Sequence, residues 1–296
     1  MPVTFFLDDR TGFEAAAAGL YAFVGTEDFE QSNLPANSAQ QVNDPLAPGV
    51  ANGPFATGTS TSVGVTVQSN ASVSDPASVA PGNFLEAYAA GFLGAADDQV
   101  LTDFGGVDNS LDLLFDPPGS SPATAVGFVP LFLDSNTIVP GTGPLTIRVY
   151  STTNVLLGTT TIVGGNSQSE ASYVGIVATG GDAIGRVNIS DGNALANWQG
   201  ADDIAVYANA LAVAADDAFT TVETTAIGAG LNVFVDNGSG ADSDAETDPF
   251  VVTAVNGVAA DVGTQVILAS GALLTLNADG TFAYDPNGAF DDLPAA

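Results

Sequence analysis

Cysteine, histidine and lysine are absent from this chain of 296 residues, and its only cations are Arg10, Arg148 and Arg186. Without cysteine the chain forms no disulfide, thiolate site or zinc ribbon, and without histidine it lacks the commonest general base. Catalysis by Ser-His-Asp or Cys-His groups is therefore excluded. Paired carboxylates can hydrolyse glycosides, but no pair stands out among so many acidic residues. We expect a protein that is not an enzyme.

Positive charge is scarce, because 34 Asp and Glu residues oppose three arginines and give a formal net charge of -31. Such a surface repels nucleic acid and anionic membranes. Most carboxylates have no side-chain cation to pair with, so water or bound metal ions must neutralise them. Calcium, a hard ion that prefers carboxylate and carbonyl oxygen, is the predicted cofactor. Adaptation to concentrated salt would produce the same composition.

Long apolar runs are also missing. The longest candidate, AVGFVPLFL (125–133), contains Pro130 and falls well short of the roughly 18 residues of a membrane span. The N-terminal MPVTFFLDDR lacks the basic region and apolar core of a secretory signal. We expect no membrane insertion, and secretion either after removal of a signal or through a C-terminal address.

Short runs rich in β-branched and aromatic residues, separated by Gly, Asn, Asp and Pro, predict strands along most of the chain. The clearest are SVGVTVQ (62–68), SLDLLF (110–115), LTIRVYS (145–151), GTTTIV (158–163), SYVGIVA (172–178), IGRVNIS (184–190) and IAVYA (204–208). This spacing predicts an all-β chain with a sandwich or jelly roll.

Two segments have helical patterns. Thr11 and Glu14 match a capping box, and the alanines that follow run to Gly19, which predicts a short helix. In NFLEAYAAGFLGAA (83–96), Phe84, Tyr88 and Phe92 are four residues apart and would share one face of a second helix. This segment is expected to pack on the sandwich as a helix or extended arm, and a partner-binding face is the alternative.

A domain boundary is expected near ANALAVAADDAF (208–219), where one strand pattern ends and another begins. From Asp216 to Ala296 there are thirteen acidic and no basic residues. We therefore divide the chain into domains 1–210 and 211–296.

The second domain resembles the bacterial cadherin-like repeats of the VCBS kind, which occur in tandem in secreted adhesins. The resemblance depends on DDAFTTVE, on NVFVDNGSGADSDAETDPFVVTAVNG and on GALLTLNADGTFAYDPNGAF. In the last of these, LLTLN and TFAYDP flank an Asp-Gly turn that predicts a hairpin. The resemblance implies an immunoglobulin-like sandwich that calcium makes rigid, in a stalk-forming surface protein.

An acidic loop in this domain alternates carboxylates with other residues, and the resemblance implies calcium ligands there. The candidates are Asp242, Asp244, Glu246 and Asp248. The loop fails the EF-hand template, because Thr247 occupies the glycine position and no Glu stands at position 12. Calcium nevertheless accepts six to eight oxygens in irregular arrangements. A calcium site and a solvated loop both remain open.

The repeat also ends before the last pair of strands that members of the family carry, which predicts an incomplete sandwich with an unpaired edge. One explanation is that the sequence is a piece of a longer protein. The other is that a strand donated by a second copy or another surface protein completes the sheet, which would make the chain a filament subunit.

The first domain more loosely resembles the jelly-roll modules of bacterial surface proteins and carbohydrate-binding modules. The matching pieces are FFLDDRTGFEAAAAGL, TEDFE (26–30), AVGF (125–128) and YVGIVATGGDAIGRVNISDGNALANWQGADDIAVYA. The resemblance implies a structural calcium shared by acids near the two ends of the domain. The candidates are Glu27, Asp28 and Glu30 at the start with Asp202 and Asp203 at the end; alternatively, the two aspartates merely begin an edge strand.

A sugar site needs an aromatic platform beside polar groups that satisfy hydroxyls. The single tryptophan, Trp198, lies between Asn197 and Gln199, so these three residues are the predicted ligand-binding residues. The alternative is a tryptophan that anchors a loop on the core. Taken together, the sequence predicts an extracellular structural or adhesive protein stabilised by calcium, with a glycan-binding module of a secreted protein as the alternative.

Overall fold

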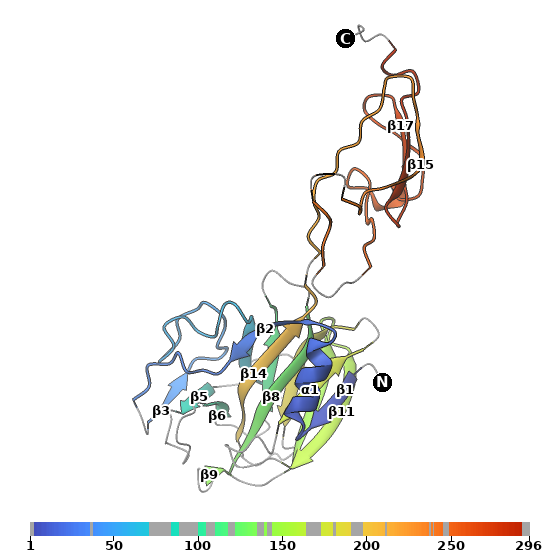
Figure 1. Ribbon diagram of the computed structural model, residues 1–296. Helices are drawn as coiled ribbons and strands as arrows, with labels where there is room; N and C mark the ends of the chain where they lie inside the picture. Colours follow the sequence, from blue (N-terminus) through green and yellow to red (C-terminus); the bar gives the residue numbers. More distant parts are fainter. Residues whose placement is uncertain are drawn as a thin grey trace. The chain divides into compact units, whose positions relative to one another are not determined.

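The computed structural model divides into two compact units, residues 1–210 and 211–296. It describes residues 3–35, 38–70, 84–88, 100–104, 110–117, 122–134, 139–140, 144–163, 173–179, 182–190, 198–210, 212–236, 238, 240–244 and 249–291. For residues 84, 86, 88, 100–104, 131–134, 139–140, 163, 198 and 199 the description covers the backbone. Figure 1 shows the strands of the first unit in two layers.

The larger sheet of the first unit has nine strands and includes both the first and the last strand of the unit. Its path runs β1-β12-β8-β14-β6-β5-β3, with β2 paired to β14 and β9 to β8. The strands are β1 (Val3–Leu7), β2 (Ala22–Glu27), β3 (Ala39–Val42), β5 (Phe84–Tyr88), β6 (Val100–Phe104), β8 (Ala123–Asp134), β9 (Val139–Pro140), β12 (Val174–Ala178) and β14 (Trp198–Ala208).

The second sheet has five strands in the order β11-β10-β13-β7-β4. They are β4 (Val65–Asn70), β7 (Ser110–Phe115), β10 (Pro144–Ser151), β11 (Leu156–Val163) and β13 (Ile184–Ser190). From β7 onward the chain passes repeatedly from one sheet to the other, as β12, β13 and β14 do in succession. The predicted all-β, jelly-roll-like sandwich is therefore confirmed for the first unit.

The core lies between these sheets and follows the period-2 pattern of the strands. Leu111 and Leu113 of β7 and Val187 and Ile189 of β13 are fully buried, together with residues of β8, β12 and β14 from the other sheet. The intervening residues of β7 and β13 point to the opposite face of the five-stranded sheet. That face is polar, and it holds the candidate site described below.

Helix α1 (Arg10–Ala18) covers the outer face of the nine-stranded sheet (Figure 1). Its Phe13 and Ala17 pack with Tyr173 and Tyr207 in a second apolar cluster. The predicted helix and its end at Gly19 are confirmed, but the predicted capping box is wrong. The cap is Asp9, whose carboxylate accepts from the backbone N–H of Gly12 at 2.9 Å, and aspartate is a strong N-cap residue. Among the described residues, no helix is both long and apolar enough to cross a membrane.

The second predicted helix is wrong over residues 84–88, which form strand β5. This strand lies between β3 and β6 and pairs with both. Leu85 and Ala87 are buried, so alternate residues face the core. Pairing on both edges satisfies the backbone and outweighs the helical spacing of the aromatics. The rest of 83–96 lies outside the described residues.

The described strands of the second unit form one antiparallel sheet in the order β15-β18-β17-β16. The elements are β15 (Ile227–Asn232), the 3-10 turn η2 (Ala259–Asp261), β16 (Val266–Ile267), β17 (Leu273–Leu276) and β18 (Thr281–Asp285). The predicted hairpin is present, because Leu276 pairs with Phe282 across the turn. Gly280 of that turn has φ 82°, which a glycine adopts without strain. The cadherin-like sandwich and the donated strand remain predictions.

Candidate functional site

The two acidic segments predicted to share a calcium ion in the first unit lie on neighbouring strands. β2 pairs with β14, and Glu27 stands opposite Ile204, directly after Asp202 and Asp203. The register of β14 is interrupted between Asp202 and Ala205, and Asp203 has φ 50°. The fold thus brings the ends of the unit together, as the resemblance implied.

Glu27 serves as a buried hydrogen-bond acceptor, with an exposed fraction of 1%. Its carboxylate accepts from the backbone N–H groups of Phe29 and Ser60 and from the side chain of Gln31. Burial raises the pKa of Glu27, and these three hydrogen bonds oppose the rise. Asp28 accepts from the N–H of Glu30, and Arg10 reaches Asp203 at 3.5 Å. Protein groups thus already contact several of the predicted ligands.

Within the described residues, no group of three or more acidic side chains is placed to hold a metal ion. In the second unit, Asp242 accepts from the N–H of Ala215 at 2.7 Å and so ties two backbone segments together. Asp244 is described, whereas Glu246 and Asp248 lie outside the described residues. Calcium binding by either acidic segment therefore remains a prediction.

The predicted sugar contacts lie at the start of β14, in the nine-stranded sheet. Trp198 and Gln199 stand opposite Leu133 and Phe132 of β8. Asn197 and the side chains of Trp198 and Gln199 lie outside the described part of the chain. Their role in binding remains a prediction.

Most of the buried polar side chains of the described residues belong to the five-stranded sheet, and nearly all of these lie on the face turned away from the apolar core, which we call the polar face. Strand register places its side chains in rows that run across all five strands. The central row runs Thr159, Arg148, Asn188, Asp112, Gln68; the flanking rows are Thr161, Thr146, Ser190, Ser110, Asn70 and Leu156, Tyr150, Arg186, Leu114, Thr66. Exposure falls along the central row, from exposed Thr159 through half-buried Arg148 to three buried side chains.

Asp112 is the centre of a hydrogen-bonded network on this face. Its carboxylate accepts from Arg186 Nη1 at 2.9 Å, from Asn188 Nδ2 at 2.7 Å and from Asn70 Nδ2 at 2.9 Å. Burial raises the pKa of Asp112, while the Arg186 guanidinium acts in the opposite direction. Arg186 also lies over the ring of Tyr150, with Cζ 3.9 Å from the ring centroid. The network holds the side chains of three strands in fixed positions.

Three atoms of the central row are buried and lack a hydrogen-bond partner among the described residues. They are the donors Gln68 Nε2 and Arg148 Nη1 and the acceptor Asn188 Oδ1. Most buried polar groups in proteins are hydrogen-bonded, so several exceptions in one row call for an explanation. Sequence analysis missed this row. Its signal was present in the predicted strands 110–115 and 184–190, where Asp112, Asn188 and Ser190 alternate with aliphatic residues.

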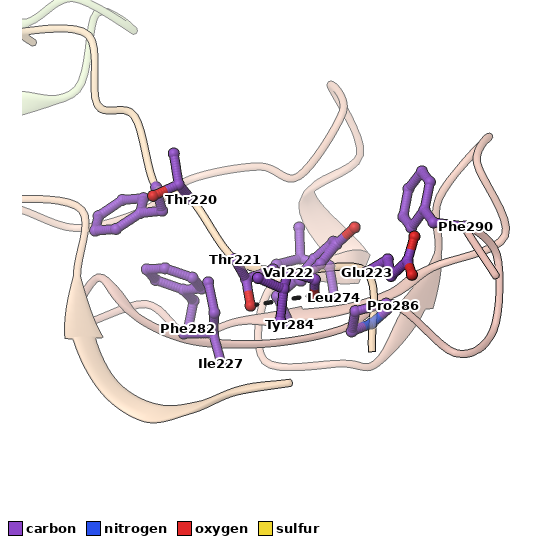
Figure 2. Close-up of a pocket in the computed structure, with 11 residues that line it drawn as sticks. Thr220, Thr221, Val222, Glu223, Ile227, Leu274, Phe282, Tyr284, Pro286 and Phe290 are labelled. Atoms are coloured by element: carbon purple, nitrogen blue, oxygen red, sulfur yellow. Dashed lines mark hydrogen bonds between the residues drawn. The ribbon is translucent and has the colours of Figure 1, made fainter. Parts of the chain in front are cut away.

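The second unit contains an apolar cavity of about 550 Å³ beside its sheet. Figure 2 shows Phe282 and Phe290 at opposite ends of it, with residues 220–223 along one side. The lining is largely aromatic and aliphatic, with Glu223 as its one charged side chain. Few polar groups converge there, so this cavity does not have the chemistry of a sugar site.

No protein-family profile and no curated protein matches the chain. Among solved structures, two variants of a family 29 carbohydrate-binding module match it. The first variant has 14% sequence identity, and the match covers 36% of this chain and 69% of that chain with a TM-score of 0.24. The second has 13% sequence identity, and the match covers 57% of this chain and 86% of that chain with a TM-score of 0.29. A family 61 carbohydrate-binding module in complex with β-1,4-galactotriose has 13% identity over 48% and 81%, with a TM-score of 0.21.

Proposed function

We propose that residues 1–210 form a glycan-binding module of a secreted protein, without catalytic activity, whose site is the polar face. The observation that carries the proposal is the central row, in which Gln68 Nε2, Arg148 Nη1 and Asn188 Oδ1 have no partner among the described residues. A ligand that satisfies this row must accept hydrogen bonds from two positions and donate one to the third. Hydroxyl groups both donate and accept, and sugars present them at high density.

The surrounding groups support the same ligand class. The row borders a buried tyrosine and several Thr, Ser and Asn side chains. Small-ligand sites commonly combine an aromatic surface with a few polar groups in fixed positions. The network around Asp112 keeps these groups in place before a ligand arrives, which reduces the entropy lost on binding. A net charge of -31 disfavours nucleic acid as the ligand.

The test is a glycan array on the full chain, followed by calorimetry with the best ligand. Gln68→Ala removes a side chain whose Nε2 has no described protein partner, so we expect the fold to persist and binding to weaken roughly 2- to 10-fold, the loss of one hydrogen bond. Gln41→Ala, at an exposed position of β3, is the matched control.

Two outcomes would contradict the proposal. If the full chain binds no glycan on the array, the proposed function is wrong. Binding that survives Gln68→Ala but disappears in Trp198→Ala, with the fold intact, would place the site at the start of β14 as the sequence predicted.

We propose as a second candidate a structural, adhesive role outside the cell, in which calcium rigidifies the chain and copies associate. The pairing of β2 with β14 supports it, because Glu27 stands opposite Ile204, the residue after Asp203. Metal binding is coupled to folding when the ligands come from segments distant in sequence. We expect calcium to raise the melting temperature above that in magnesium at equal ionic strength, with particle growth if strands are donated. Equal melting temperatures in calcium and in chelator would refute the calcium role.

A further inference from the structure

The three arginines differ in whether a carboxylate accompanies them. Arg10 pairs with Glu14 at 2.8 Å and with Asp203 at 3.5 Å, and Arg186 pairs with Asp112 at 2.9 Å. Arg148 makes no ion pair within the described part of the chain, although the sequence contains 34 acidic residues. Its side chain is half-buried, and the Nη1 atom is buried with no hydrogen-bond partner among the described residues.

An arginine in this state is costly for a folded protein. The guanidinium carries a full positive charge and five N–H donors, so burial without partners is unfavourable. A buried charge is normally paired and hydrogen-bonded. No carboxylate of the described residues pairs with Arg148, and an anionic group of a ligand would supply such a partner.

We propose that Arg148 binds the carboxylate of an acidic sugar, so that the polar face selects glycans containing uronic acids. This inference rests on the proposed glycan-binding function and names the ligand class. The planar guanidinium forms paired hydrogen bonds with a carboxylate, and these charge-assisted bonds are stronger than those to a neutral hydroxyl.

The position of Arg148 in the row supports a sugar as the carrier of the carboxylate. Strand register places it between Thr159 of β11 and Asn188 of β13, so a hydroxyl donor and an amide flank the guanidinium. In a 1,4-linked uronan the ring oxygen and the glycosidic oxygen flank the carboxylate, and the same sugar carries two free hydroxyls, so the Thr159 hydroxyl and the Asn188 amide have oxygen atoms to contact. The overall charge of -31 repels anions, so an acidic glycan binds here through a local contact and not through long-range attraction.

The experiment compares three matched pairs of polymers: galacturonan with galactan, glucuronan with glucan, and mannuronan with mannan. The members of each pair differ mainly in carrying a carboxylate or a hydroxymethyl group. Binding is measured on the full chain by calorimetry, with the best acidic ligand also tested as its methyl ester. Arg148→Gln removes the charge from the site, and Arg10→Gln removes the same charge from α1, on the other sheet.

We expect the unmodified protein to bind one acidic polymer roughly 10- to 100-fold more tightly than its neutral partner and its ester. Arg148→Gln should abolish this preference and leave the melting temperature equal or higher, because an unpaired charge is removed, and Arg10→Gln should retain the preference. Equal binding of acid, ester and neutral polymer would overturn the inference while the glycan-binding function stands. An equal loss for acid and neutral polymers in Arg148→Gln would do the same. Binding to no glycan of any kind would overturn both.

Discussion

Arg186 donates from Nη1 to Oδ1 of Asp112 over 2.9 Å, and the exposed fractions of the two side chains are 3% and 0%. The same carboxylate also holds Asn70 and Asn188, so residues of β4, β7 and β13 converge on one side chain. A buried ion pair with several hydrogen bonds positions its neighbours more than it stabilises the fold. This relationship explains why the polar face is ordered, and it carries the first prediction.

Asp112→Asn should lower the free energy of unfolding by about 3–5 kcal/mol, because it leaves the Arg186 charge buried without a carboxylate. Denaturant unfolding of the full chain measures the loss. Asp203→Asn is the matched control, since it removes the half-exposed partner of Arg10 and should cost about 0–1 kcal/mol. Both should be measured with a chelator, so that metal binding does not contribute. Equal losses would contradict the role assigned to Asp112.

Gly175→Ala should destabilise the first unit by roughly 1–3 kcal/mol, as overpacking does in a close-packed interior. A Cβ atom at Gly175 would lie 2.5 Å from Phe13 Cβ, well inside van der Waals contact. Phe13 is fully buried, and its ring lies 5.7 Å from that of Tyr173 and 5.6 Å from that of Tyr207, so it has little room to move.

Gly228→Ala is the control for this substitution, because a Cβ atom there would meet nothing within 4 Å. Thermal unfolding should show a lower melting temperature for Gly175→Ala and little change for Gly228→Ala. If Gly175→Ala leaves the melting temperature unchanged, α1 does not pack tightly on the nine-stranded sheet.

Glu27 should make the first unit less stable as the pH rises. Burial raises its pKa in the folded state, so the protonated form favours folding. Its contribution is fully present below the unfolded pKa of about 4.3 and is lost as the pH rises through the higher folded value. Glu27→Gln removes this titration. It also replaces a carboxylate acceptor with an amide, which shifts the stability by an amount that does not depend on pH.

The measurement is the melting temperature of both proteins between pH 4 and pH 8, in chelator. The melting temperature of the unmodified protein minus that of Glu27→Gln should fall with rising pH. Glu30→Gln, at an exposed position, removes the same charge and serves as the control. A difference that stays constant or rises with pH would show that the hydrogen bonds to Glu27 outweigh its burial.

Gly280→Ala should destabilise the second unit selectively. The turn residue has φ 82°, and an added Cβ would lie 2.5 Å from Asn232 Oδ1 and 2.6 Å from a ring atom of Phe234. A residue with a Cβ atom is strained in this conformation, at a cost of about 1–3 kcal/mol. Hydrogen exchange should show faster exchange in β17 and β18, with the strands of the first unit unchanged. Uniform acceleration across both units would indicate that they unfold together.

Much of the fold was readable from local patterns. SLDLLF (110–115) and IGRVNIS (184–190) match β7 and β13, because alternation of aliphatic and polar residues reflects a sheet with one face on a core. The short helix and its glycine stop follow equally from local preferences. The predictions for Phe84–Tyr88 and for the helix cap failed, because pairing on both strand edges and the nearby Asp9 carboxylate overrode the local signals.

The sequence alone determined the chemistry available to this protein: no thiol, no imidazole, three guanidinium groups and an excess of carboxylates. It also showed which strand residues are polar. Only the tertiary structure decided which of them meet, since Gln68, Asp112, Arg148 and Asn188 lie up to 120 positions apart and become neighbours through strand register alone. Register depends on the packing of both sheets on one core, and no single strand carries that information.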